Sequence, residues 1–325
     1  MLIVGQGERN YIMQVVCEAT QNPSVNVQVA AFECLVRIMG LYYDKMGFYM
    51  ERALFGVRVS GDECFDAYLS RPSQLTVLGM NHTDDTVALQ AVEFWSTVCE
   101  EEIELAIEAA EALDYNELPE HESKYFAKVA LPEIVPVILR LLTRQEEDAD
   151  EDEWNVSMAA GTCLALLAQA VGDAIVASVI PFIEANIKST DWHQREAAVM
   201  TFGSILDGPD PQVLNPLVSQ ALPILIEMMR DPNMHVKDTT AWTLGRICDI
   251  LIGTIKTDVH LHPLVSALVH GLEDSPRIIS NCCWALMNLS DQLSGFYEDE
   301  AAPASGPLSP YYQGVIDALI RVTEK

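Results

Sequence analysis

Positive charge is scarce in this chain. Its 325 residues include 19 Lys and Arg against 48 Asp and Glu, which gives a net charge of −29. A field of that sign repels nucleic acids and anionic membranes and attracts basic proteins and peptides. Half of the residues are hydrophobic, which is too many for a disordered acidic chain. We therefore expect a folded protein with basic partners, no nucleic-acid partner and no membrane insertion.

The usual sequence signatures of catalysis are also missing. The chain has no G-x-G-x-x-G, P-loop, H-E-x-x-H or G-x-S-x-G motif and no convincing strand. His260 and His262, with Asp258 and His270 nearby, are the best candidate metal ligands. Helical residues two positions apart point about 200° away from each other, so we expect solvated helix-end histidines instead. We expect no enzymatic activity, no metal and no cofactor.

Disulfide frameworks and long apolar runs are absent as well. None of the eight cysteines forms a C-x-x-C pair, and most lie in apolar helical sequence, which is typical of reduced core thiols in a cytosolic or nuclear protein. We expect the vicinal Cys282 and Cys283 to be one core and one surface position of a helix rather than a redox pair. No run reaches eighteen apolar residues, and residues 1–7 are too short and uncharged for a signal peptide. We expect a soluble intracellular protein.

A two-helix unit recurs along the chain. Residues 217–229 form an apolar helical pattern, Asp231, Pro232 and Asn233 form a turn, and 236–250 form a second helical pattern. The same parts recur at 176–206 and 261–289, and second helices are expected at 27–41, 87–99 and 156–170. Val236 and Ile278 are 42 residues apart, and a two-helix period of that length is typical of HEAT repeats. We predict an all-α HEAT-repeat solenoid over 1–325, with about six to seven helical pairs and a concave face suited to binding proteins.

Residues 57–74 interrupt this pattern. Gly61 and Pro72 would break a helix through the segment, and its removal restores the repeat period. The codon for Val57 begins with GT and one codon for Gln74 ends with AG. We expect an atypical insertion at 57–74 and hypothesise that it is a translated intron.

An acidic tract precedes Trp154. It places seven carboxylates in eight residues, namely Glu146, Glu147, Asp148, Asp150, Glu151, Asp152 and Glu153. Carboxylates cannot be buried unpaired, so we predict a solvated loop at 145–153. The tract is either a solvating linker or a receptor for a basic partner. A second loop or linker is expected at 293–309, before the last helix.

Five stretches of the chain resemble the importin-β family. They are 11–20, 92–99, the acidic tract with residues 154–155, 197–203 and 241–248. The resemblance covers nearly everything outside 1–7 and 57–74 and corresponds to the middle repeats of that family, so we expect a chain truncated at both ends. It implies a nuclear import receptor found in the cytoplasm, the nucleus and the nuclear envelope at the nuclear pore. The alternative is another HEAT scaffold, such as a phosphatase regulatory subunit.

The resemblance also implies partners and contact residues. The concave face would bind a basic helix of an importin-α-type adaptor or cargo through Glu93, Glu100, Trp154, Trp242 and Trp284. The acidic tract would contact both this adaptor and Ran-GTP. Glu8, Tyr11 and Ile12 would form part of a pocket for Phe-Gly nucleoporins, although the family usually has Phe at the place of Tyr11. Trp95 and Trp192 are expected to be packing residues.

Overall fold

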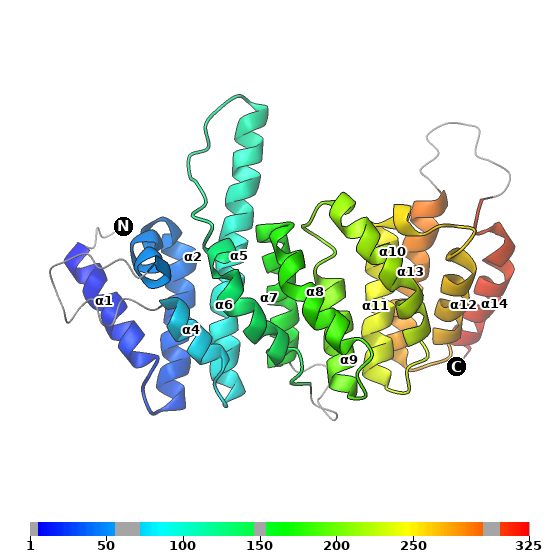
Figure 1. Cartoon of the computed structure of the whole chain (residues 1–325), viewed down its shortest axis with the longest axis horizontal. Helices are drawn as coiled ribbons and strands as arrows, with labels where there is room; N and C mark the ends of the chain where they lie inside the picture. Colours follow the sequence, from blue (N-terminus) through cyan, green and yellow to red (C-terminus); the bar gives the residue numbers. More distant parts are fainter. Residues whose placement is uncertain (1–5, 56–71, 146–153, 295–305, 325) are drawn as a thin grey trace. The chain divides into compact units, whose positions relative to one another are not determined.

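The computed structural model describes residues 6–55, 72–145, 154–294 and 306–324 (Figure 1). Within these residues every regular element is a helix, so the all-α prediction is confirmed. The α-helices are α1 (Gln6–Ala19), α2 (Val25–Phe55), α4 (Pro72–Met80), α5 (Asp85–Asp114), α6 (Phe126–Leu141), α7 (Val156–Val171), α8 (Ala174–Asn186), α9 (Trp192–Ser204), α10 (Pro211–Met228), α11 (Met234–Ile250), α12 (Leu261–Gly271), α13 (Pro276–Ser294) and α14 (Tyr312–Thr323). Two short 3-10 helices are η1 (Ile252–Thr254) and η2 (Ser309–Tyr311).

The chain forms two compact units, Met1–Ser178 and Val179–Lys325. In the first unit α5 lies between α2 and α7, and α1, α4 and α6 pack on these three helices. Helix α5 is 30 residues long and extends beyond its neighbours, with the segment 115–125 returning alongside it (Figure 1). The sequence pattern predicts this helix at 87–99 only, so the second half of α5 is not predicted.

In the second unit α11 lies between α9 and α13, and α10 and α12 pack on α11 and α13. The repeat is visible in equivalent hydrogen bonds between these central helices. Thr239 Oγ1 donates to Glu196 Oε1 at 2.6 Å, and 42 residues further on Asn281 Nδ2 donates to Asp238 Oδ1 at 2.7 Å. The period found in the sequence is therefore a period of side-chain contacts.

The predicted turns supply the caps that begin the second helices. Asp191 accepts a hydrogen bond from the amide of His193 at 3.0 Å, and Asn233 accepts one from the amide of His235 at 2.9 Å. Asp84 and Asn155 cap α5 and α7 in the same way. Each cap satisfies an amide that the first helical turn leaves unpaired.

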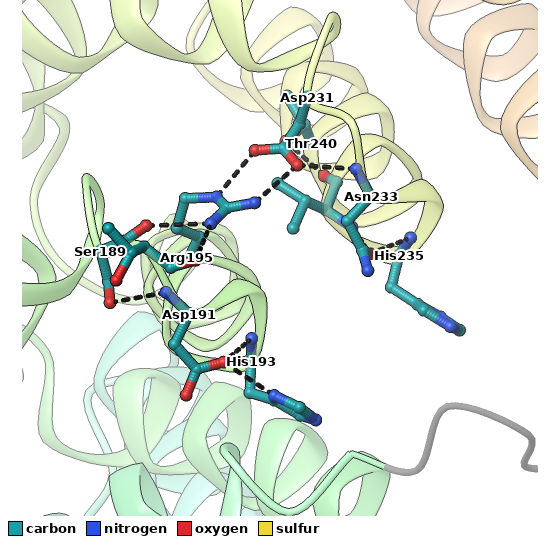
Figure 2. A network of polar contacts seen from close by, with 10 residues as sticks. Ser189, Asp191, His193, Arg195, Asp231, Asn233, His235 and Thr240 are labelled. Atoms are coloured by element: carbon teal, nitrogen blue, oxygen red, sulfur yellow. Dashed lines mark hydrogen bonds and ion pairs between the residues drawn. The ribbon is translucent and has the colours of Figure 1, made fainter.

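Ion pairs join successive turns of the second unit. Figure 2 shows Arg195 at the start of α9 holding both carboxylate oxygens of Asp231, with Nε to Oδ2 and Nη2 to Oδ1 each at 2.8 Å. The Nη1 atom of Arg195 donates to the carbonyl of Ser189 at 2.9 Å. One repeat later Lys237 pairs with Asp274. These contacts fix the register of one two-helix unit on the next.

The core follows the apolar stripes of the helices. The apolar stripe of α11 is buried at Ala241, Leu244, Ile247 and Cys248, and Leu251, which directly follows the helix, is buried as well. Among the described cysteines Cys17, Cys99, Cys163, Cys248 and Cys282 are buried, Cys34 is exposed and Cys283 is partly exposed. The prediction that one of Cys282 and Cys283 lies in the core and the other nearer the surface is thus confirmed, with Cys282 as the buried residue.

One stretch of α2, Val25–Gly47, is apolar and long enough to cross a membrane when judged by length and composition alone. Its buried residues share one side of the helix, at Ala31, Phe32, Leu35, Met39, Tyr43 and Met46. Glu33 and Arg37 are exposed. This is the pattern of an amphipathic helix that packs on one face, as α2 does against α1, α4 and α5.

Three of the predicted loop segments fall largely outside the described residues. Of the insertion predicted at 57–74, the structure describes only 72–74, which begin α4 with Pro72 at its first position. The acidic loop predicted at 145–153 is described only at its first residue, and the loop predicted at 293–309 only at its two ends. A proline at the first helical position is favourable, because its missing amide would be unpaired there in any case.

Candidate protein-binding site

Glu93 and Glu100 share one exposed face of α5, as their spacing of two turns predicts. Partial burial raises the pKa of Glu100, and the neighbouring charges of Glu93 and Glu104 raise it further. A raised pKa means that the ionised form is disfavoured in the free protein. A bound cation would relieve this repulsion, so the face favours a basic ligand.

The second half of α5 continues this acidic face, and our sequence reasoning missed it. Glu104 and Glu108 line a cleft of about 560 Å³ with Tyr42, Asp44 and His121. Tyr42 has non-helical backbone angles and marks a kink in α2 beside this cleft. The available signal was the dense run of glutamates after Glu100. The apolar periodicity that predicts this helix ends at Cys99, because the glutamates interrupt the apolar stripe beyond it.

A buried carboxylate, Glu102, holds α5 in place where the second half of the helix begins. Glu102 is 4% exposed and accepts hydrogen bonds from the Tyr43 hydroxyl at 2.7 Å and from the amides of Phe126 at 2.5 Å and Ala127 at 3.3 Å. The Tyr43 hydroxyl in turn accepts a hydrogen bond from the amide of Lys124 at 2.9 Å. Glu102 therefore occupies the amino-terminal end of α6, where a negative charge is favourable. It ties α2, α5 and α6 together beneath the exposed acidic face.

Trp154 directly precedes Asn155, the residue that caps α7. Trp154 exposes 54% of its surface, so the residue is accessible to a ligand. The acidic tract from Glu146 to Glu153 lies outside the described residues. Trp154 belongs to the first unit, together with Glu93 and Glu100.

Trp242 and Trp284 occupy equivalent positions in the second unit, on the neighbouring helices α11 and α13. Both are partly exposed. Each ring covers a glycine of the preceding second helix, Trp242 over Gly203 and Trp284 over Gly245. Any side chain on these glycines would collide with the indole. The same packing of an indole on a glycine therefore occurs in two successive repeats, and it leaves part of each ring accessible.

Arg246 lies one turn after Trp242, and its guanidinium carbon is 5.4 Å from the centre of the indole ring. Burial lowers the pKa of Arg246, while the charges of Asp207 and Asp249 act in the opposite direction. We did not single out this arginine in the sequence. Nothing in a helical pattern indicates whether an arginine lies over a tryptophan on the next turn or extends into solvent.

The other two tryptophans differ from each other. Trp95 is completely buried and donates to the Thr76 hydroxyl at 3.1 Å, so its predicted packing role is confirmed. Trp192 is partly exposed and stacks on His235 with ring centres 5.0 Å apart, at the amino-terminal ends of α9 and α11.

Helix α1 has an exposed apolar face. Tyr11, Ile12 and Val15 expose 67%, 46% and 44% of their surface, and the exposed Glu8 lies one turn earlier on the same side. The predicted residues Glu8, Tyr11 and Ile12 are thus brought together on one helix face.

Possible metal ligands do not converge among the residues that the structure describes. His262 is exposed as expected, but His260 is only 8% exposed, so the expectation that it is solvated is wrong. Its Nδ1 atom accepts a hydrogen bond from the amide of Lys256 at 3.2 Å, because the turn before α12 folds back on itself.

Comparisons with known proteins agree with this architecture. Residues 192–247 match the model of a HEAT-like repeat, and 263–325 match that of importin subunit beta-1-like TPR repeats. Importin subunit beta-1 of Schizosaccharomyces pombe is 54% identical over 98% of this chain. A crystal structure of importin β superposes with a TM-score of 0.87 at 46% identity over 99% of this chain.

Two further solved structures contain a relative of this chain together with another protein. A complex of Kap95 with Nup1 and a structure of Kap95p with RanGDP each match 97% of this chain, at 45% and 44% identity and a TM-score of 0.83. This chain spans only about a third of these proteins, 34% of the Schizosaccharomyces pombe protein and 33% of each of the two complexed chains. Along nearly its whole length, the chain is therefore a homologue of importin subunit beta-1, and it corresponds to about a third of the length of these relatives.

Proposed function

We propose that this chain is a binding segment of a nuclear import receptor, without enzymatic activity, which takes a basic helix of an importin-α-type adaptor or of a cargo. The observation that carries the proposal is the repeated pair of partly exposed tryptophans, Trp242 and Trp284, each of which packs on a glycine of the second helix of the preceding repeat. Flat aromatic faces held in register suit the arginines and lysines of a helical ligand, because cations are attracted to the face of an indole ring.

The acidic surface supports the same partner chemistry. Glu93 and Glu100 present carboxylates on one face of α5 whose mutual repulsion a cation would relieve. The net charge of −29 would attract a basic ligand over distance and speed its association. The acidic tract before Trp154 adds seven carboxylates to the first unit.

We further propose that the chain contacts Ran-GTP through the acidic tract, so that Ran and the basic adaptor compete for one segment. Two ligands that need the same segment exclude each other, so binding of Ran-GTP would release the adaptor. The exposed face of α1, with Glu8, Tyr11 and Ile12, is proposed to contact Phe-Gly nucleoporins. These roles fit a protein that moves between cytoplasm and nucleus through the nuclear pore.

Replacement of Trp154 by alanine tests the proposal, because this exposed indole contributes little to packing. Cation–π contact contributes about 0.5–2 kcal/mol, so we expect Trp154→Ala to weaken binding of an Arg- and Lys-rich helical peptide by roughly 2- to 30-fold. The measurement is calorimetric or fluorescence titration of the full chain. Leu118→Ala is the control, because Leu118 is a 93% exposed apolar residue outside the proposed surface. Equal effects of the two substitutions would contradict the proposed function.

A further inference from the structure

Helices α8 and α10 border an apolar groove of about 210 Å³. On α10 its lining includes Leu217, Ala221 and Ile224, and on α8 it includes Ile180 and Ile183. Residues spaced by three, four and seven positions lie on one face of a helix, so each helix turns one mainly apolar face to the groove. All of the lining residues belong to the second unit. The groove is therefore a feature of one compact unit.

The groove is accessible from solvent and has buried residues in its lining. Ile180, Leu217 and Ile224 are partly exposed, whereas Phe202 and Leu225 are buried. A ligand group that enters between the partly exposed side chains therefore meets apolar surface on several sides. Apolar surface that stays accessible and concave is typical of a binding site.

The next repeat indicates that packing does not require an apolar side chain at Ile224. Ser266 on α12 occupies the equivalent position 42 residues further on and is exposed. The core positions of the two helices do correspond, since Leu222 and Leu264, also 42 residues apart, are both buried. The apolar wall of the groove is therefore a particular feature of the α8 and α10 pair.

Charge and size limit what the groove can hold. Of the described residues that line it, Glu184 alone is charged, although the chain as a whole carries a net charge of −29. An arginine or lysine that entered would lose its water with little to compensate, so an uncharged group is favoured. An apolar cavity of about 150 Å³ is enough for a benzene ring. The groove therefore suits a single aromatic side chain without polar atoms.

We propose that this groove binds the phenylalanine side chain of an uncharged protein segment. Phenylalanine fits better than tyrosine or tryptophan, because it brings no polar atom that needs a partner inside the groove. Gln220 is exposed at the rim, and its carboxamide can both donate to and accept from the main chain of such a segment. The site goes beyond the proposed function, since its lining supports this ligand whether or not α1 contacts Phe-Gly nucleoporins.

Methyl NMR of the full chain with labelled isoleucines reads the groove directly, because Ile180, Ile183 and Ile224 lie in its lining. The probe is an uncharged Gly- and Ser-rich peptide, blocked at both ends, with one phenylalanine. The control peptide has alanine in its place. One buried side chain supports only weak binding, so the peptides are used at about 1 mM or more. We expect the phenylalanine peptide to shift these three methyl signals and the alanine peptide to leave them unchanged.

A variant tests the groove with the residue that the next repeat carries. We expect Ile224→Ser to weaken binding of the phenylalanine peptide roughly fivefold, because apolar contact with the ring is lost. Ile316→Ser is the matched control, since Ile316 is an exposed isoleucine on α14, and we expect it to leave the affinity unchanged. The remaining isoleucine signals of each variant verify that the chain is folded.

The signal of Ile12 separates this site from the one proposed on α1. If the phenylalanine peptide shifts Ile12 but not the three groove methyls, the inference is overturned and the proposed contact of α1 stands. If it shifts the groove methyls but not Ile12, the inference stands and the proposed contact of α1 fails. Equal shifts with both peptides, or equal affinities of Ile224→Ser and Ile316→Ser, overturn the inference. If Ile224→Ser does not fold, the comparison of the two peptides on the unmodified chain decides the question.

Discussion

Single residues decide how closely the central helices of the second unit approach one another. A Cβ atom on Gly203 would lie 2.5 Å from Cζ3 of Trp242 and 2.6 Å from the hydroxyl oxygen of Thr243. Real Cβ atoms do not come this close to ring or hydroxyl atoms. The absence of a side chain at Gly203 is therefore what allows the indole of Trp242 to lie against α9.

We predict that Gly203→Ala destabilises the chain by about 1–3 kcal/mol, because the indole must move to accommodate the methyl group. The matched control is Gly314→Ala in α14, where an added Cβ meets nothing within 4 Å. That change should stabilise the protein by about 0.5–1 kcal/mol through helix propensity. Urea unfolding followed by circular dichroism measures both. A Gly203→Ala variant as stable as Gly314→Ala would contradict the packing of Trp242 on Gly203.

Glu102 makes the stability of the first unit depend on pH. Burial raises its pKa above the ordinary value of 4.5, and the hydrogen bonds from Tyr43, Phe126 and Ala127 only partly oppose this. The folded state therefore holds the proton more tightly than the unfolded state. The contribution of Glu102 to stability is largest at low pH and declines as pH rises from 4.5 through the folded-state pKa.

We predict that Glu102→Gln, which does not titrate, removes this dependence. The free energy of unfolding of the unmodified chain, measured relative to that of Glu102→Gln, should fall as pH rises above 4.5. Urea titrations at a series of pH values provide the measurement. A difference that grows with pH would mean that the hydrogen bonds outweigh burial and that the pKa is lowered.

At the scale of elements, the turns between helices carry the strongest inter-repeat contacts. Arg195 on α9 and Asp231 in the turn before α11 are 14% and 8% exposed and share two hydrogen bonds. In the first unit Arg144 and Asp85 also join neighbouring two-helix pairs, but they are 33% and 49% exposed and meet through a single contact at 3.2 Å. A buried two-point pair should couple its helices more strongly than an exposed one-point pair.

We predict a coupling energy of about 1–3 kcal/mol between Arg195 and Asp231 in a double-mutant cycle with alanine. The same cycle for Arg144 and Asp85 should give about 0–1 kcal/mol. Hydrogen exchange of the α9 and α11 amides measures the coupling energy of the Arg195–Asp231 pair. Exchange of the α5 and α6 amides measures the coupling energy of the Arg144–Asp85 pair. Equal coupling in the two cycles would mean that burial of the Arg195 pair does not strengthen it.

The sequence allowed some elements to be predicted closely and others not. Helices α9, α11 and α13 were expected nearly at their observed bounds, because Asp191, Asn233 and the prolines of the turns give clear start signals. The second half of α5 was missed because glutamates interrupt its apolar stripe, and its position depends on the hydrogen bonds of Glu102 to α6. Contacts of this kind join residues far apart in sequence and leave no local pattern.

Some features of the candidate site could likewise be predicted from the sequence, and others could not. Helical spacing was enough to place Glu93 with Glu100 and Tyr11 with Ile12, and the repeat period placed Trp242 and Trp284 at equivalent positions. The seating of each indole on a glycine depends on how closely two helices approach, which periodicity does not determine. The position of the Arg246 guanidinium over the ring of Trp242 depends on the conformation of a single long side chain.

At the scale of the whole molecule, the excess of 48 acidic over 19 basic residues is the property that most strongly limits the choice of partner. Side chains such as Glu93 and Trp154 supply local contacts, whereas the total charge acts on any basic ligand before it makes contact. Salt screens this long-range attraction but leaves cation–π and apolar contacts largely unchanged.

The salt dependence of ligand binding tests the central claim most directly. The dissociation constant of the full chain for an Arg- and Lys-rich helical peptide should be measured from about 0.03 M to about 0.3 M salt, over which the screening length falls roughly threefold. We predict that affinity falls at least about tenfold across this range, because attraction between opposite charges drives association. An affinity that does not change with salt would contradict a receptor that recognises a basic segment through its acidic surface.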